Sequence, residues 1–153
     1  MGIENILKVS SNLPLSKKVV VNILFTYGLL NSKFNDVLKP YGISIQQFNV
    51  LRILRGQKGS AASLATVQER MINKMSNTTR LIDKLIKKDL VLKKINKANK
   101  RKIDITITAL GLNFLTEIDI LIDSTEQQIT GVLSENEAQE LIRLLGKIRL
   151  IAD

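Results

Sequence analysis

The positive charge of this chain is concentrated in one segment, and that segment has two recognisable halves. Eleven Lys or Arg and two Asp fall between Lys74 and Lys102, a balance of +9 that equals the net charge of the whole chain. Its first half repeats apolar residues at helical spacing, and its second half is a polar ribbon between two strand-like runs. A neutral body with one basic block is typical of a polyanion-binding protein. A helix followed by a basic ribbon fits the grooves and phosphates of duplex DNA.

The first half predicts a helix from about Lys74 to Lys88. Helical-wheel angles place an apolar stripe on one side, made of Met75, Thr78, Ile82, Leu85 and Ile86. Polar side chains able to contact bases or phosphates lie on the other side: Ser76, Asn77, Arg80, Lys84 and Lys87, with Thr79 near the boundary. Asp83 is interpreted as a local partner for Arg80 or Lys87. The helix should therefore pack through its stripe and present Ser, Asn, Arg and Lys outward.

The second half predicts a β-hairpin with a basic loop. Leu90–Leu92 and Ile103–Ile107 are the strand signals, the latter alternating Ile with Asp and Thr. Between them, residues 93–102 hold six Lys or Arg and no acid. Lysine-rich loops are often only solvated, and edge lysines discourage strand pairing. This density exceeds that need, so the ribbon is interpreted as a wing that contacts phosphate or the minor groove.

Helices account for most of the remaining chain. We predict them over residues 15–38, from Ser44 to the turn at 56–60, over 61–71 with Leu64, Val67 and Met71 inward, over 108–130, and over 134–151. Ser44 with Gln47 and Ser134 with Glu137 have capping-box spacing. The fold class is mainly α with a small β-hairpin wing (α+β), in one domain, 1–153. Residues 44–107 would form a winged helix-turn-helix lobe, with 15–38 and 108–151 as dimerisation helices.

The helices over 61–71 and 74–88 can be interpreted in two ways. One is a helical hairpin with a solvated polar face. The other is a helix-turn-helix, whose second helix places Arg on guanine, Asn on adenine, and Ser or Thr on either base or phosphate. The wing that follows favours the second interpretation.

The terminal helices carry more apolar surface than one stripe needs. An intramolecular bundle with the first helix is one explanation. We favour a homodimer, which would also set two recognition helices about one DNA turn apart. The predicted dimerisation residues are Leu115, Ile118, Ile122, Leu141, Leu145 and Ile148.

Composition excludes several function classes. The chain has no Cys and no His, which removes disulfides, thiolate chemistry, the commonest metal ligand and the commonest general base. We therefore expect no metal, no cofactor and no enzymatic activity. The longest apolar run, Val19–Leu30, contains Asn22 and Thr26 and is too short to span a bilayer. The N-terminus lacks a signal-peptide layout, so we expect a cytoplasmic protein associated with the nucleoid through DNA.

Three segments resemble the MarR (multiple-antibiotic-resistance) family of transcriptional regulators. Residues 76–85 with the exit at 88–91 resemble its recognition helix, residues 99–101 with 107–111 resemble its wing motif, and residues 133–137 resemble the start of its last dimerisation helix. Asn99 stands where the family usually has Asp, which helps orient the wing Arg. The resemblance implies a dimeric winged-helix regulator, often a repressor released from a palindromic operator by a small aromatic effector. It also implies an effector pocket, for which the candidate residues are Tyr27, Phe34, Phe48 and Met71.

These observations predict a sequence-specific regulator that binds double-stranded DNA as a homodimer. Recognition-helix contacts would come from Ser76, Asn77, Thr79, Arg80, Lys84 and Lys87, and wing contacts from Lys97, Asn99, Lys100, Arg101 and Lys102. Arg101 would enter the minor groove. Two alternatives remain: a nonspecific architectural nucleic-acid binder, and a basic protein-interaction or membrane-surface module.

Overall fold

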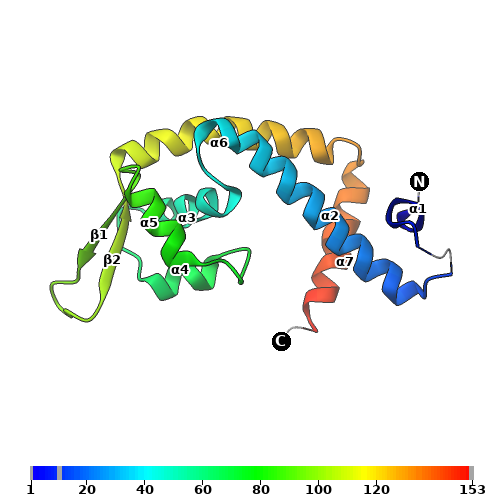
Figure 1. Ribbon diagram of the computed structural model, residues 1–153, viewed down its shortest axis with the longest axis horizontal. Helices are drawn as coiled ribbons and strands as arrows, with labels where there is room; N and C mark the ends of the chain where they lie inside the picture. The colour runs from blue at the N-terminus through cyan, green and yellow to red at the C-terminus, as the bar shows by residue number, and fades with distance from the viewer. Residues whose placement is uncertain (1, 10–11, 152–153) are drawn as a thin grey trace. The chain divides into compact units, whose positions relative to one another are not determined.

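A computed structural model of the chain describes residues 2–9 and 12–151 (Figure 1). It is mainly helical, with one antiparallel hairpin, as the sequence predicted. In chain order the elements are α1 (Ile3–Leu7), α2 (Leu15–Leu38), the 3-10 helix η1 (Lys39–Tyr41), α3 (Ile45–Arg55), α4 (Leu64–Arg70), α5 (Thr78–Ile86), β1 (Val91–Ile95), β2 (Ile103–Ile107), α6 (Ala109–Thr130) and α7 (Glu135–Arg149).

The chain divides into two compact units, residues 1–115 and residues 116–153. The boundary falls inside α6. In the second unit, α7 contains no buried residue. The winged helix-turn-helix lobe lies entirely within the first unit.

Side-chain caps fix where α3 and α7 begin. The Ser44 hydroxyl accepts a hydrogen bond from the Gln47 backbone at 3.2 Å, and the Gln47 side chain accepts one from the Ser44 backbone at 2.8 Å. Ser134 and Glu137 repeat this arrangement at the start of α7. Both predicted capping boxes are confirmed. They satisfy backbone N–H groups that have no partner inside the helix.

The core of the first unit lies between α3, α4, α5 and the hairpin. Its most deeply buried side chains include Val50, Leu51, Val67, Met71, Ile82, Leu85, Val91 and Ile105, each at most 2% exposed. The predicted apolar stripe of the recognition helix is therefore confirmed at Ile82 and Leu85. Two predictions of burial were wrong. Leu64 is 41% exposed, and Met75, which precedes α5, is 92% exposed because helical spacing does not hold before Thr78.

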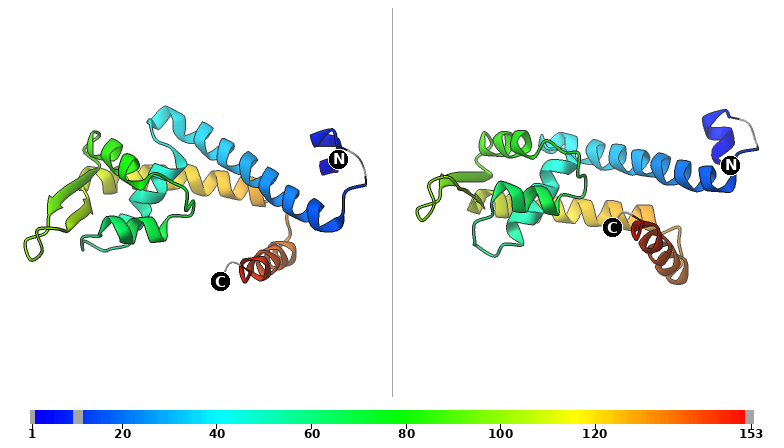
Figure 2. Two further views of the ribbon diagram at one scale, coloured as in Figure 1. Left: turned by 60° about the horizontal axis from the view of Figure 1, so that its bottom comes forward. Right: turned by 90° about the horizontal axis from the view of Figure 1, so that it is seen from below.

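β1 and β2 pair in antiparallel register, with Val91 opposite Ile107 and Ile95 opposite Ile103. The hairpin projects away from the helices of its unit (Figures 1 and 2). Ala62 forms an isolated bridge with Ile105 through two backbone hydrogen bonds of 2.9 Å. This pairing keeps the chain before Ser63 extended. It explains why α4 begins at Leu64 and not at residue 61 as predicted.

Two other helices are shorter than the sequence predicted, and one helix was not predicted. α5 spans Thr78–Ile86 and not residues 74–88, and α7 ends at Arg149 and not at residue 151. α1 was not predicted. α1 has only five residues, too few for a periodic pattern to be visible. Its Glu4 carboxylate forms an ion pair of 2.7 Å with the Lys18 ammonium on α2, which lowers the pKa of Glu4.

The start of α6 is bonded to the segment that leaves α5. The Thr108 hydroxyl donates to the Asp89 carbonyl at 2.7 Å and accepts from the Gly111 backbone at 2.9 Å. The Thr108 backbone donates to the Leu90 carbonyl at 3.0 Å. Gly111 allows this close approach, because a Cβ at that position would lie 2.3 Å from the Leu90 carbonyl oxygen.

We expect Gly111→Ala to destabilise the protein by about 1–3 kcal/mol, the usual cost of overpacking. The clash involves a backbone carbonyl, so it should exceed the helix propensity that alanine gains. Gly28→Ala in α2 is the matched control, since nothing lies within 4 Å of its added Cβ. That variant should be neutral or stabilising by up to about 1 kcal/mol. Thermal unfolding checks both, and equal melting temperatures would contradict the close approach.

Candidate nucleic-acid interface

α4 and α5 form the helix-turn-helix, held together by the side chain of Gln68. Its amide donates to the Lys74 carbonyl at 3.1 Å, and its carbonyl accepts from the Thr78 hydroxyl. Thr78 is 3% exposed, so this contact lies at the base of α5. One side chain of α4 thus fixes both the turn and the start of the second helix.

The N-terminus of α5 uses two residues that the sequence assigned to DNA. Asn77 is the N-cap, and its Oδ1 accepts from the Arg80 backbone at 3.2 Å. A bidentate contact with adenine needs both the oxygen and the nitrogen of an Asn amide. In this structure the Asn77 oxygen already accepts from the Arg80 backbone, whereas no hydrogen bond from the amide nitrogen is seen among the described residues. The Ser76 hydroxyl is enclosed and lacks a hydrogen-bond partner among the described residues, so it does not point outward as predicted.

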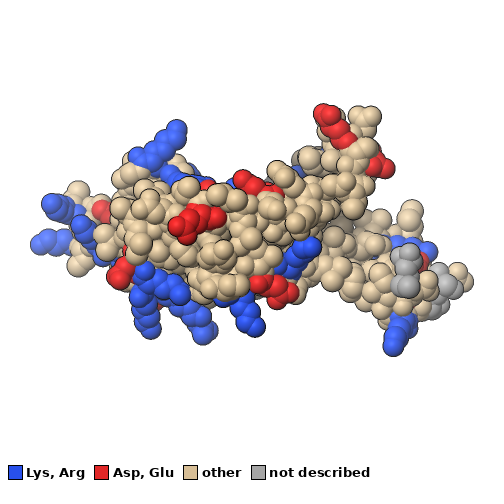
Figure 3. Space-filling model, turned by 90° about the horizontal axis from the view of Figure 1, so that it is seen from above, with Lys and Arg blue, Asp and Glu red and all other residues tan. Residues whose placement is uncertain are grey.

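The outward face of α5 agrees with the prediction from Thr79 onward. Thr79, Arg80, Lys84 and Lys87 are all exposed. Among the residues that the structure describes, the side chains of Arg80, Lys84 and Lys87 have no acidic partner within 4 Å. Figure 3 shows Lys and Arg side chains gathered at the end of the first unit that carries the hairpin and α5. Unpaired cations on a rigid helix can bind anions without first breaking an ion pair.

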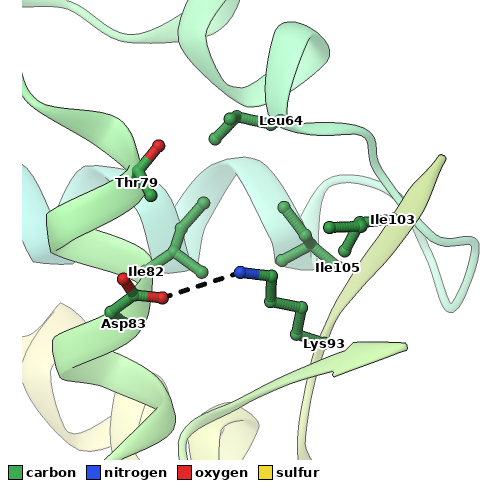
Figure 4. A pocket seen from close by; sticks show the side chains of 7 residues that line it. All are labelled: Leu64, Thr79, Ile82, Asp83, Lys93, Ile103 and Ile105. Carbon is green, nitrogen blue, oxygen red and sulfur yellow. Dashed lines mark ion pairs between the residues drawn. The ribbon is translucent and has the colours of Figure 1, made fainter. Parts of the chain in front are cut away.

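Asp83 contacts the hairpin, not its own helix. Its carboxylate lies 3.8 Å from the Lys93 ammonium on β1, whereas the sequence suggested Arg80 or Lys87 as its partner. The pair lines a small pocket, open to solvent, between α5 and the hairpin (Figure 4). Both side chains are well exposed, so the pair contributes little to stability. The remaining lining residues are Leu64, Thr79, Ile82, Ile103 and Ile105.

The tip of the hairpin, residues 96–102, is here called the wing loop. Its ends are joined by a hydrogen bond of 2.9 Å from the Asn96 backbone to the Lys102 carbonyl. Inside it, the Asn99 side chain accepts from the Arg101 backbone at 3.1 Å. Asn99 thus supplies an acceptor for Arg101 although it replaces the Asp usual at that position. Lys97, Lys100, Arg101 and Lys102 are all exposed, as predicted.

The predicted dimerisation residues fall into two groups. Leu115, Ile118 and Ile122 are at most 3% exposed in the single chain, so their apolar surface is already covered without a partner. Leu141 and Ile148 on α7 are 47% and 43% exposed, and Leu145 is partly exposed. Sequence periodicity could not separate these groups, because both have the same spacing.

The predicted effector residues differ in exposure. Phe48 and Met71 belong to the core, at 3% and 1% exposure. Tyr27 is half exposed, and its hydroxyl accepts from the Asn73 amide at 3.3 Å. Phe34 is partly buried. None of the four lines the pocket beside Asp83 and Lys93.

Residues 2–9 and 12–151 are the part of the chain that the structure describes. In that part of the chain, no three His, Cys, Asp or Glu side chains are placed to hold a metal ion. No helix there is long and apolar enough to cross a membrane.

Residues 43–103 match the family model described as "MarR family". These residues contain the α3–α5 helices and most of the hairpin described above. This region is a MarR-family winged-helix domain. The resemblance noted in the recognition helix and wing is thereby confirmed.

Similarity extends over nearly the whole chain. The HTH-type transcriptional regulator MhqR of Bacillus subtilis is 25% identical over 137 residues, which cover 90% of this chain and 93% of MhqR. The organohalide-sensing transcriptional regulator RdhR, solved in its 2,4-dichlorophenol-bound form, has a TM-score of 0.82 at 19% identity, covering 90% of this chain and 81% of RdhR. A mutant MarR from E. coli complexed with operator DNA has a TM-score of 0.77 at 22% identity, covering 89% and 99%. The chain therefore has the fold of MarR-family transcriptional regulators.

Proposed function

We propose that this MarR-family protein is a transcriptional regulator without catalytic activity that binds a palindromic operator sequence-specifically as a homodimer. α5 would enter the major groove, where Arg80 contacts a base edge and Lys84 and Lys87 contact phosphates. Arg101 would enter the minor groove beside it, with Lys97, Lys100 and Lys102 on phosphates.

The observation that carries this proposal is the unpaired cationic face of α5 next to an organised basic hairpin. Arg80 begins the exposed row of the helix, and its guanidinium has no acidic partner among the described residues. The helix beneath it is anchored through Thr78 and Gln68. Base readout needs a side chain held in register on a rigid element, and this arrangement provides one. The structure of the mutant MarR from E. coli complexed with operator DNA supports the same mode of binding.

Exposed apolar residues support the homodimer. On α7, Leu141, Ile142, Leu144 and Ile148 are all at least 43% exposed, and on α2 Leu15, Val20 and Leu24 are all at least 55% exposed. Helices with this much exposed apolar surface are typical of subunit interfaces. A two-fold dimer would present two recognition helices to the half-sites of a palindrome.

Selection of bound fragments from random DNA tests the proposal most directly. We expect a single enriched palindrome whose half-sites lie about one helical turn apart. Binding without enrichment would favour a nonspecific architectural protein. Weak binding to DNA together with binding to anionic vesicles would favour a membrane-surface module.

Repression released by a small aromatic effector is the second part of the proposal. Its support is the structure of RdhR, a similar protein solved with bound 2,4-dichlorophenol. In this chain Tyr27 on α2 bonds to Asn73, two residues before Met75 on the approach to α5. A phenol that competes for Asn73 would disturb the segment that leads into the recognition helix.

We expect an aromatic acid or phenol to raise the melting temperature and weaken operator binding. A ligand at about 100 times its Kd stabilises the folded state by about 2.7 kcal/mol. Tyr27→Phe keeps the ring and removes the hydroxyl that competes for Asn73, so operator affinity without ligand should already be lower and the ligand should reduce it less. The measurement is thermal shift in parallel with DNA affinity over a panel of aromatic acids and phenols. If the whole panel leaves both quantities unchanged, the effector proposal fails.

A further inference from the structure

The wing loop is organised by one side chain, that of Asn96. Its Nδ2 donates to both carboxylate oxygens of Asp104, at 3.0 and 3.2 Å. Its Oδ1 accepts from the backbone of Ala98 at 2.9 Å and of Asn99 at 2.8 Å. A single amide therefore joins the loop on one side to a strand on the other.

Asp104 is well placed to act as the fixed end of this connection. It lies on β2, one residue inside the terminal pair Ile95–Ile103, and is partly buried. The paired strands hold its backbone in register, so the carboxylate has a defined position relative to the hairpin. The loop, by contrast, has only the Asn96–Lys102 and Asn99–Lys102 backbone hydrogen bonds across it.

The connection continues from Asn96 to the wing cations. Asn99, which is held by Asn96, accepts from the Arg101 backbone through its side chain and from the Lys102 backbone through its carbonyl, at 3.1 and 2.9 Å. Among the described residues, the Lys100 and Arg101 side chains have no ion-pair partner. The backbone of the loop therefore sets where these two side chains begin.

The charge of Asp104 is also informative. It is an acid that follows three consecutive cations, Lys100, Arg101 and Lys102, and it would repel a nearby phosphate. This repulsion is unfavourable for DNA binding, so a favourable contribution is expected from the same carboxylate. Asp104 accepts two hydrogen bonds from Asn96, and a charged carboxylate forms stronger hydrogen bonds than a neutral acceptor does.

We propose that Asn96 and Asp104 form a wing clasp, a pair of positioning residues that holds Lys100 and Arg101 in the arrangement that binds DNA. Neither residue needs to touch DNA. The clasp acts by removing the conformational freedom that the loop would otherwise lose on binding. This inference rests on the proposed function, and it adds two residues that the basic pattern of the sequence does not indicate.

An exchange of the two side chains tests the clasp. Asn96→Asp keeps the acceptor for Ala98 and Asn99 but removes the donor and sets two carboxylates against each other. The double variant N96D/D104N restores a donor and an acceptor, now reversed, with the net charge of the native chain. Asn99→Asp is the charge control, since it adds the same charge to the same loop and keeps an acceptor for Arg101.

We expect N96D to weaken operator binding about tenfold more than N99D does, because ordering the loop then costs free energy on binding. The double variant should recover the affinity of the native chain. Amide hydrogen exchange without DNA should be faster at Ala98 and Asn99 in N96D and slow again in the double variant. Circular dichroism should show all four proteins folded, since the loop lies outside the core.

Three results would overturn the proposal. One is equal affinity of N96D and N99D for the operator. Another is a double variant as weak as N96D. The third is faster amide exchange in N96D with no loss of affinity. Failure of the proposed function would give a different result. The native chain itself would then enrich no sequence from random DNA, and the rate of amide exchange in its wing loop would not affect that outcome.

Discussion

Leu141→Glu is expected to convert the protein from two chains to one and to abolish tight operator binding. Leu141 is 47% exposed in the single chain, so a carboxylate there can reach water and the chain should stay folded. In a dimer the same carboxylate would be buried without a partner, which costs about 3–5 kcal/mol. The dimer dissociation constant should therefore rise at least about a hundredfold.

Sedimentation at micromolar concentration measures the mass, and circular dichroism measures the helix content. Asn136→Glu is the matched control, since it adds the same charge to the first turn of α7 on the opposite side of the helix. It should leave the dimer intact, because an acid is favourable at a helix N-terminus. A native chain that sediments as a monomer would contradict both the dimer and the palindrome.

Arg80→Ala should cost about 1–3 kcal/mol on the selected operator and much less on a scrambled duplex. Arg80 is exposed on α5, its guanidinium has no acidic partner among the described residues, and only its backbone is used by the Asn77 cap. Removing the side chain should therefore leave the helix in place. The loss would report base readout and not unfolding.

Lys100→Ala serves as the contrasting variant, because a lysine in the wing loop is expected to contact phosphate. It should weaken both duplexes about equally and reduce the salt slope by about one unit. Arg101→Ala should lie between the two, with the largest loss on A·T-rich flanks, where a narrow minor groove attracts cations. Fluorescence anisotropy across a salt series measures all three. If Arg80→Ala lost equal affinity for both duplexes, the protein would be a nonspecific architectural binder and not a sequence-specific regulator.

Local chemistry determined most of the elements. The two capping boxes fixed the starts of α3 and α7, because a Ser hydroxyl and a side chain three residues later satisfy each other's backbone groups. The alternation of Ile103, Ile105 and Ile107 fixed β2. The density of cations marked the wing, and the outward row of Arg80, Lys84 and Lys87 followed from the helical period alone.

Contacts between distant residues were decided only by the tertiary structure. The Ala62–Ile105 bridge shortened α4, and the pairing of Asp83 with Lys93 involves a strand that follows α5. Burial of Leu115, Ile118 and Ile122, beside exposure of Leu141 and Ile148, separates apolar residues that share one spacing.

The wing shows the same division in a single loop. Its sequence determined that it is basic, exposed and bounded by two strands, since these properties depend on neighbouring residues. It did not determine that Asn96 bonds to Asp104, eight residues away, or that Asn99 holds the Arg101 backbone. Periodicity records which side of an element faces the core. The partner that a polar side chain meets depends on how the chain closes on itself, and only the folded structure decides that.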